Sequence, residues 1–182
     1  MNLKQLMNNT NYMHSRNVAR LSALLAKEAG YPAQEVDLIE QVALFHDVGK
    51  TDIPQNILNK PDRLTPEEFE IVKTHTAIGR EQILSAAEIL FLAARTAYEH
   101  HERLDGHGYL NLTEQEIHPY SKLIAVADVF DALYSKRAYK EAWSINDISE
   151  YFHGQAGKQF DDSLVTLFFS ILQEVLSVYH AA

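Results

Sequence analysis

Histidine and aspartate side chains recur along the chain at positions where helical patterns predict that they face the interior. Seven of them stand out, from five predicted helices or helix ends: His14, His46, Asp47, His75, His100, His101 and Asp128. An imidazole or carboxylate buried without a partner costs roughly several kcal/mol, so these groups must pair with one another or with a cation. A shared metal centre would satisfy all of them together.

The absence of cysteine limits what such a centre can be. The chain has no Cys and nine His, which excludes disulfides, thiolate zinc sites, iron–sulfur clusters and cysteine nucleophiles. Any metal must bind nitrogen and oxygen, and imidazole with carboxylate suits Fe or Mn, and also Zn, Ni or Co. Seven ligands exceed the four to six or so of one cation, so we expect two divalent ions bridged by Asp47. Two ions about 3.5–4 Å apart can hold a hydroxide for in-line attack on phosphorus.

Each of these residues also has a structural explanation when it is taken alone. A single histidine on an apolar face, such as His14 or His75, is more often hydrogen-bonded within the core than bound to a metal, and the pair His100-His101 is evenly balanced. Asp128 alone would suit an ion pair or a helix cap. Three basic residues would by themselves be solvated surface charges: Lys50, Arg137 and Lys140. Only the joint pattern indicates a site.

The elements that must position these residues are helices. Apolar residues recur mostly three and four apart, and no segment shows sustained alternation, which predicts an all-α domain. Helices are predicted over Tyr12–Ala29, Ala33–His46, Ala86–His101 and Ser121–Leu133, from Thr65 onward, from Ser144 onward, and from the cap Asp161 through Val178. The helix that starts at Thr65 would bury Phe69 and Val72. Residues 48–64 contain Gly and Pro and are expected to form a loop.

Length and charge narrow the class of protein. With 182 residues, a single domain is the expectation. Sixteen basic against 25 acidic residues give a net charge of −9, which disfavours long nucleic acids as partners. No apolar run approaches the length of a membrane span, and the first residues lack the apolar stretch of a signal peptide. We therefore expect a cytoplasmic protein that does not bind a membrane.

Several segments, in order and at matching spacings, resemble the HD-GYP family. The stretch from His46-Asp47 to Pro54 is similar to the opening signature of that family, and Lys60 to Phe69 continues it. The later segments that match are His75 with Gly79, His100 to Tyr109, Asp128 to Leu133, Arg137 to Lys140, and Gly157 to Asp161. The resemblance covers roughly residues 14–167, and a single HD-GYP-like domain is expected over residues 1–182.

The resemblance implies an HD-domain helical bundle with a metal centre in its core. It also implies a phosphodiesterase that converts cyclic di-GMP to pGpG, GMP or both. By position, one metal would be held by His14, His46, Asp47 and Asp128, and the other by Asp47, His75, His100 and His101. Lys50 would lie beside the scissile phosphate, and the remaining substrate contacts would come from Tyr109, Arg137 and Lys140. An acidic protein that binds a dianion needs such local positive charge.

The chain departs from the family pattern at two positions. Some members have a glutamate four residues before the first histidine and bind a third metal, whereas Thr10 occupies that position here, so two metals are favoured. Gly108-Tyr109 is followed by Leu110 instead of proline. Because proline fixes φ near about −65° and restricts its neighbour, leucine is expected to leave this lip of the site looser or differently bent. Substrate choice and partner contacts would be affected more than metal binding.

The expected function is therefore the hydrolysis of a cyclic dinucleotide by a metal-bridging hydroxide, with Asp47 and Lys50 as its main catalytic residues. One alternative keeps the fold as a weakly active or inactive adaptor that binds cyclic dinucleotides and docks a partner such as a diguanylate cyclase (GGDEF-type) domain. Another keeps the chemistry but changes the substrate, for example to cyclic GMP–AMP. The tail around Tyr179-His180 is expected to be exposed.

Overall fold

The structure is a computed structural model that describes residues 12–86, 90–136 and 141–180. Within these ranges the regular structure is helical, apart from one isolated bridge between Ala156 and Phe160. The prediction of an all-α fold is confirmed.

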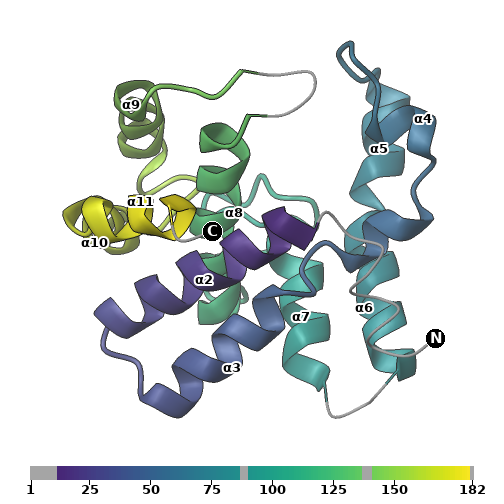
Figure 1. Ribbon diagram of the computed structural model, residues 1–182. Helices are drawn as coiled ribbons and strands as arrows, with labels where there is room; N and C mark the ends of the chain where they lie inside the picture. Colours follow the sequence, from purple (N-terminus) through teal and green to yellow (C-terminus); the bar gives the residue numbers. More distant parts are fainter. Residues whose placement is uncertain (1–11, 87–89, 137–140, 181–182) are drawn as a thin grey trace.

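The helices follow one another in the order shown in Figure 1, where they carry the same labels. Their bounds are α2 Tyr12–Glu28, α3 Ala33–Ala43, the 3-10 helix η1 Val48–Asp52, α4 Gln55–Leu58, α5 Pro66–Lys73, α6 His75–Ala86, α7 Phe91–Glu99, α8 Pro119–Tyr134, α9 Ile145–Gln155, α10 Asp162–Ser170 and α11 Leu172–His180.

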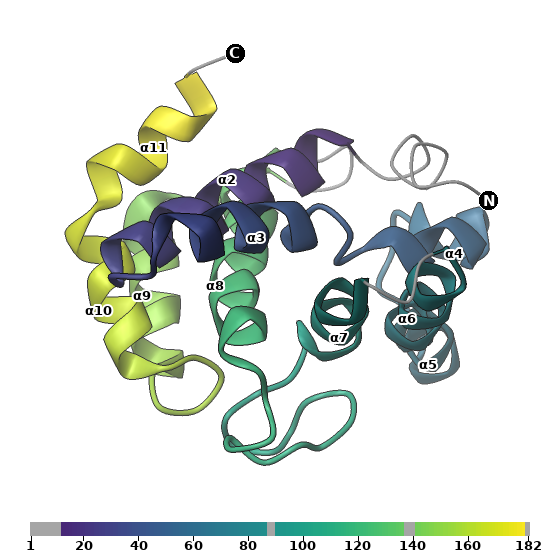
Figure 2. The same ribbon diagram turned by 90° about the horizontal axis from the view of Figure 1, so that it is seen from below.

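The centre of the molecule is formed by α2, α3, α7 and α8 (Figures 1 and 2). The predicted apolar stripe of α2 is buried: Val18, Leu21 and Leu25 are fully enclosed. Ile124 of α8, also predicted to face inward, is buried as well. Burial of one such side chain stabilises the folded state by about 1.5–3 kcal/mol. This core fixes the directions in which α2 and α8 present their polar residues.

A second group of helices, α4 to α6 with η1, lies beside this core (Figure 2). Here η1 crosses the start of α6 at a distance that only glycine allows. A Cβ atom on Gly49 would lie 1.9 Å from the backbone oxygen of His75 and 2.5 Å from the backbone nitrogen of Gly79. The two glycines therefore bring the segment after His46 directly against the segment that begins with His75.

Several predicted helix boundaries near the candidate ligands were wrong. The helix predicted to reach His46 ends at Ala43, because the next residues turn with tighter backbone bonds: the His46 N–H donates to Ala43 O at 3.2 Å. The helix predicted from Ala86 begins at Phe91, while Ala86 belongs to α6. The expected loop at residues 48–64 contains η1 and the short α4.

The faces and lengths of two other elements also differ from expectation. Thr65 starts α5 with a capping box as predicted, but Phe69 is 44% exposed and Val72 only partly buried, because no residue of this short helix is buried. The predicted last helix is divided at Ile171 into α10 and α11, which meet at 65°. By length and composition, none of the helices in the described ranges could cross a membrane by itself; α10 and α11 meet these criteria only as a bent pair.

Candidate metal centre

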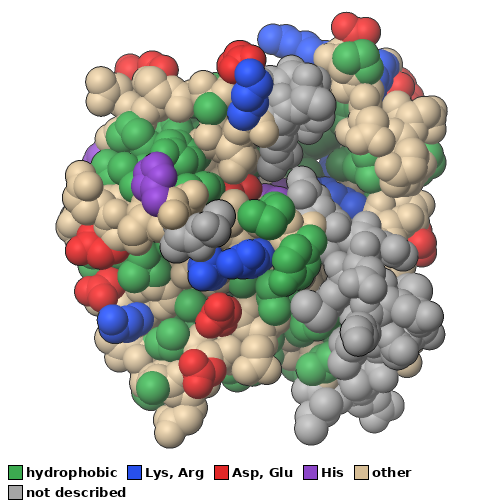
Figure 3. Space-filling view, viewed as in Figure 1, with side chains coloured by type: hydrophobic (Ala, Val, Ile, Leu, Met, Phe, Trp, Pro, Cys, Tyr) green, Lys and Arg blue, Asp and Glu red, His purple; other side chains and the backbone are tan. Residues whose placement is uncertain are grey.

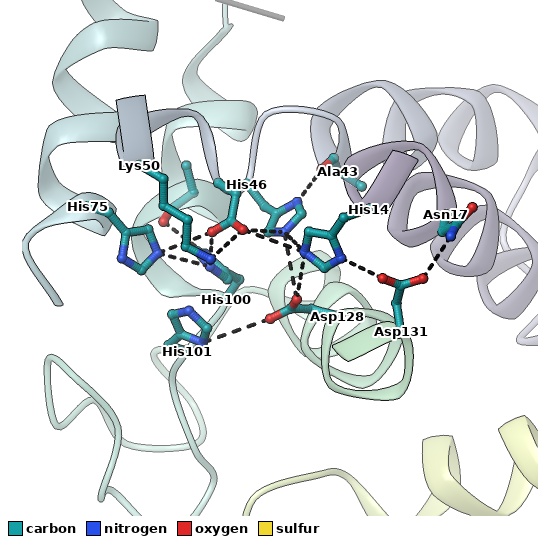
Figure 4. A network of polar contacts seen from close by, with 12 residues as sticks. His14, Asn17, Ala43, His46, Lys50, His75, His100, His101, Asp128 and Asp131 are labelled. Carbon is teal, nitrogen blue, oxygen red and sulfur yellow. Dashed lines mark hydrogen bonds and ion pairs between the residues drawn. The ribbon is translucent and has the colours of Figure 1, made fainter. Parts of the chain in front are cut away.

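The predicted ligands lie together in the interior, although they come from five different elements (Figure 4). His14 belongs to α2 and Asp128 to α8, and the pair His46-Asp47 lies in the turn between α3 and η1. His75 is the first residue of α6, and His100-His101 directly follow α7. All are buried except His101, whose side chain is 24% exposed.

The ligand atoms fall into two adjacent groups. Asp47, His75, His100 and His101 form one, and His14, His46 and Asp128 form the other; within each group the ligand atoms lie within 4.8 Å of one another. The sequence resemblance implied the same two sets, except that it placed Asp47 in both of them. Each group has the nitrogen and oxygen donors that Fe, Mn, Zn, Ni or Co accept.

Asp47 lies between the two groups and turns one oxygen to each. Its Oδ2 lies 3.5 Å from Nε2 of His14 and 3.5 Å from Nε2 of His46. Its Oδ1 lies 3.4 Å from Nε2 of His75 and 3.6 Å from Nε2 of His100. A carboxylate in this position is able to bridge two cations.

The hydrogen bonds of four imidazole rings prepare them as ligands. His14 Nδ1 lies 2.6 Å from Asp131 Oδ2, and the Nδ1 atoms of His46, His75 and His100 meet a backbone carbonyl three residues earlier at 2.7 to 3.0 Å. Because these partners are acceptors, Nδ1 carries the proton in each neutral ring and Nε2 presents a lone pair to the interior. Metal-binding histidines are oriented in this way.

The Nε2 atoms of these rings face one another in pairs. Nε2 of His46 and Nε2 of His14 are 3.3 Å apart, and Nε2 of His75 and Nε2 of His100 are 3.5 Å apart. Asp47 Oδ1 is buried and has no hydrogen-bond partner within the described part of the chain. Such converging acceptors are costly unless a cation is placed among them. The residues present therefore fit a metal centre.

The two central carboxyl groups are ionised. Burial alone would raise the pKa of Asp47, but the charges of Lys50 and His46 outweigh it and hold this pKa well below its usual range. For Asp128, burial is outweighed mainly by the hydrogen bond with His14, and its pKa is likewise well below the usual range. Both groups are therefore ready to bind a cation at neutral pH.

The pKa values of His100 and His101 are shifted in the opposite direction from that of His14. Burial, together with the charge of His46, lowers the pKa of His100 to about 4 although Asp47 opposes this shift, and burial with His100 also lowers the pKa of His101. These rings are neutral, which is the form that binds metals. Burial also opposes protonation of His14, but its hydrogen bonds to surrounding aspartates outweigh it and raise the pKa of His14 well above the usual value. That proton marks an excess of negative charge in this group, which a cation would neutralise.

Sequence reasoning missed the carboxyl group that orients His14. Asp131, one turn after Asp128 on α8, accepts from His14 through Oδ2, while its Oδ1 accepts from Asn17 at 2.8 Å and from the Tyr179 hydroxyl at 2.9 Å. The spacing of three residues on one helix face was the available signal. The expectation of an exposed tail was wrong for Tyr179, which is partly buried and bonded to this aspartate.

The centre opens to solvent on one side, and histidine and acidic side chains are visible at the bottom of a hollow in Figure 3. Lys50 stands at this opening: Nζ lies 2.5 Å from Asp47 Oδ2, and its side chain is 34% exposed. A neighbouring cavity of about 710 Å³ extends from Lys50 along the segment that contains Lys60 and Arg63. The ring of Tyr109 covers His101, with centroids 4.7 Å apart.

Three residues named in the sequence analysis lie outside the described part of the chain. They are Arg137 and Lys140, predicted to bind the phosphates of the substrate, and Thr10. Of the predicted substrate contacts, the structure thus brings Lys50 and Tyr109 to the metal centre.

The family model for the HD domain matches residues 2–164. The chain therefore belongs to the HD domain family. Two solved structures share its fold. One is Bd1817, an HDG"Y"P protein from Bdellovibrio bacteriovorus, with a TM-score of 0.73 and 23% identity, covering 91% of this chain and 53% of that chain. The other is the HD domain of the phosphodiesterase PgpH from L. monocytogenes in complex with cyclic-di-AMP, with a TM-score of 0.67 and 22% identity, covering 99% of this chain and 97% of that chain.

Curated relatives are more similar in sequence. A cyclic di-GMP phosphodiesterase of Thermotoga maritima is 41% identical over 92% of this chain and 46% of its own length. The cyclic di-GMP phosphodiesterase response regulator RpfG of Xanthomonas campestris is 41% identical over 81% and 40%. A 3'3'-cGAMP-specific phosphodiesterase of Vibrio cholerae is 36% identical over 91% and 32%. The chain thus spans less than half the length of these relatives, and the predicted resemblance to the HD-GYP family is confirmed.

Proposed function

We propose that this chain is a metal-dependent phosphodiesterase that hydrolyses cyclic di-GMP to pGpG, GMP or both at a centre of two divalent ions. The observation that carries the proposal is the position of Asp47, whose two oxygens face separate sets of imidazole nitrogens. The names of the relatives in Thermotoga maritima and Xanthomonas campestris support the choice of substrate.

In this proposal the chain supplies the ligands and keeps them oriented. His14, His46 and Asp128 hold one ion, His75, His100 and His101 hold the other, and Asp47 is shared. Fe or Mn suits these donors first, and Zn, Ni or Co would also fit. Two such ions would supply Lewis acidity, which generates a nucleophile from water near neutral pH and offsets negative charge at phosphorus.

Lys50 is the side chain best placed to contact a scissile phosphate. Its ammonium group lies beside Asp47 and is partly open to solvent, so a phosphate oxygen that approaches the centre meets this charge. We assign it the stabilisation of charge that develops in the transition state. Tyr109 at the same opening contacts the substrate, and Arg137 and Lys140 remain proposed phosphate ligands.

A different cyclic dinucleotide is the second candidate substrate. Two relatives from Vibrio cholerae that are 36% identical to this chain are named 3'3'-cGAMP-specific phosphodiesterases. A mixed cyclic dinucleotide should therefore be included in the same assay. An adaptor without turnover is the other alternative, and the intact set of ligands argues against it. Cytoplasmic location and a diguanylate cyclase partner stay predictions.

The decisive experiment combines metal analysis with hydrolysis of a panel of cyclic dinucleotides. Protein loaded with Mn or Fe should convert cyclic di-GMP to a linear product, and Asp47→Ala should abolish turnover while the helical content is kept. Asp52→Ala, which changes an exposed aspartate at the end of η1, is the matched control and should stay active. Metal-loaded protein that hydrolyses none of the dinucleotides would contradict the proposal.

A further inference from the structure

Glu102, the residue after the ligand His101, is almost completely buried but does not face the metal centre. It is 4% exposed. Its Oε1 accepts the backbone N–H of Leu110 at 2.8 Å, and its Oε2 accepts the backbone N–H of Leu112 at 2.9 Å. Both carboxyl oxygens are thus used by the backbone of the loop that connects α7 to α8, which projects from the helices in Figure 2.

The loop approaches Glu102 so closely that a side chain would not fit. A Cβ atom on Gly108 would lie 2.7 Å from the carboxyl carbon and 2.7 Å from Oε1 of Glu102. Asn111, between the two donor residues, has φ of 56° and is the single non-glycine residue with positive φ among those described. Such a conformation costs free energy and persists where the surroundings impose it. Residues 108–112 are therefore wrapped around the Glu102 carboxyl group.

Tyr109 is part of this wrapped segment, and its ring is the part that reaches the site. Its neighbours Gly108 and Leu110 both contact Glu102. The Tyr109 ring lies 4.7 Å from the ring of His101 and 6.3 Å from that of His75, measured between centroids. The position of Glu102 thus sets the position of Tyr109 over one group of ligands.

The bond from Leu110 depends on the residue that departs from the family pattern. Proline at this position would have no N–H, so Oε1 could not receive this bond. The sequence led us to expect a looser lip with leucine. The contacts favour the opposite, because the Leu110 N–H adds a partly buried hydrogen bond to the segment that proline would otherwise stiffen.

We propose that Glu102 is a positioning residue whose carboxyl group fixes residues 108–112, and with them Tyr109, over the metal centre. Leu110 supplies one of the two bonds by which it does so. The effect on loop order is independent of the proposed function, whereas the effect on turnover rests on it.

The test combines two substitutions, one on each side of the hydrogen bond between the Leu110 N–H and Glu102. Glu102→Gln keeps the size of the side chain but turns an NH2 group toward one of two N–H donors, so it should speed amide hydrogen exchange at Leu112 roughly ten- to hundredfold. Leu110→Pro removes one of these donors, so the glutamine can turn its NH2 toward the proline. In the double variant, exchange at Leu112 should therefore be within about threefold of that in Leu110→Pro alone.

Controls separate this role from general stability and from the proposed function. Glu116→Gln changes an exposed carboxyl group that also accepts a backbone N–H in this loop, from Thr113, and should leave exchange at Leu112 unchanged. With cyclic di-GMP, Glu102→Gln should raise KM about tenfold with a smaller change in kcat, since Tyr109 contacts substrate. Unchanged exchange in Glu102→Gln, or strictly additive effects in the double variant, would overturn the proposal. Absence of turnover in every variant would contradict the proposed function alone.

Discussion

Asp131 shows how a side chain outside the proposed ligand set can orient a side chain within it. It accepts from His14 Nδ1 at 2.6 Å and is itself held by Asn17 and Tyr179. A carboxylate in this position fixes the ring and makes Nε2 a better donor to a cation. Burial tends to raise the pKa of Asp131, but the bond with His14 outweighs it and the pKa is lowered, so the carboxylate is ionised at neutral pH.

Asp131→Asn should therefore weaken metal binding at one group only. The amide removes the charge behind His14, and the affinity of the group that contains His14, His46 and Asp128 should fall about 10- to 100-fold. Titration of metal-free protein, followed by calorimetry, would show one weakened step and one unchanged step. Asp162→Asn, at an exposed position on α10, is the control. Equal affinities in Asp131→Asn and the unsubstituted protein would contradict this role.

The sequence predicted which residues cluster at the candidate metal centre, but it did not predict the residues that orient them. His46 and His75 end apolar stripes, and an imidazole in such a place demands a partner, so their type and spacing were informative. Asp131 has the same chemistry as any aspartate in an ion pair or cap. Its role depends on a bond to His14, which is 117 residues away in the chain, and its spacing of three residues from Asp128 indicates a shared helix face but not this contact.

The close crossing of η1 and α6 is the feature of the helices on which the centre most depends. Gly49→Ala would place a methyl group against the backbone of His75 and force the two elements apart. We expect the free energy of unfolding to fall by about 1–3 kcal/mol or more, together with loss of metal at the group that contains His75. Denaturant unfolding and metal analysis would measure both.

Gly154→Ala provides the matched comparison for this crossing. Gly154 lies in α9, and nothing comes within 4 Å of a Cβ atom built there. Alanine should therefore leave metal content unchanged and alter stability by no more than about 1 kcal/mol, in the stabilising direction. Similar losses in both variants would show that the crossing has no special role.

The cap of α10 makes a contribution to stability that depends on pH. Asp161 accepts the backbone N–H of Ser163 at 2.8 Å. Burial raises the pKa of Asp161, but the side-chain and backbone hydrogen bonds of Ser163 outweigh it and lower this pKa below its usual value of 3.8. The contribution is thus complete above the unfolded pKa and is lost as pH falls through the lower folded pKa.

Two substitutions distinguish the cap from its charge. Asp161→Ala should lower the free energy of unfolding at pH 7 by about 0.5–2 kcal/mol, whereas Asp161→Asn, which also caps helices well, should change it much less. As pH falls below 3.8, the free energy of unfolding of Asp161→Asn should rise relative to that of the unsubstituted protein. A difference that is independent of pH would contradict the assigned shift.

Helix types were predictable from sequence, but several ends were not. Periodicity identified α2 and α8, and Thr65 located the start of α5 because capping is a local effect. At the end of α3, both the backbone N–H and the ring Nδ1 of His46 bond to Ala43 O, and α10 and α11 meet at 65° at Ile171. Such local breaks leave no signal in the spacing of apolar residues.

For the whole chain, metal binding and folding should be strongly linked. The ligands join five elements from α2 to α8, so a cation bound to the folded state opposes the separation of these elements. Free metal at 100 times its dissociation constant raises the free energy of unfolding by about 2.7 kcal/mol. For a chain of this size, that increase raises Tm by roughly 5–10 °C. Calorimetry with metal and with chelator would measure this shift. Asp47→Ala should show little of it, and a shift of equal size in Asp47→Ala would contradict the link.

The hydrogen bond from Tyr179 to Asp131 extends this link to the end of the described chain. The seven ligands all lie before residue 129, so a shortened chain without α11 would keep each of them. It would nevertheless lose the hydroxyl that steadies the carboxylate behind His14. A helix that contributes no ligand would then decide how firmly the first histidine of the centre is held, and boundaries chosen from the motifs alone would cut away part of the support for the metal.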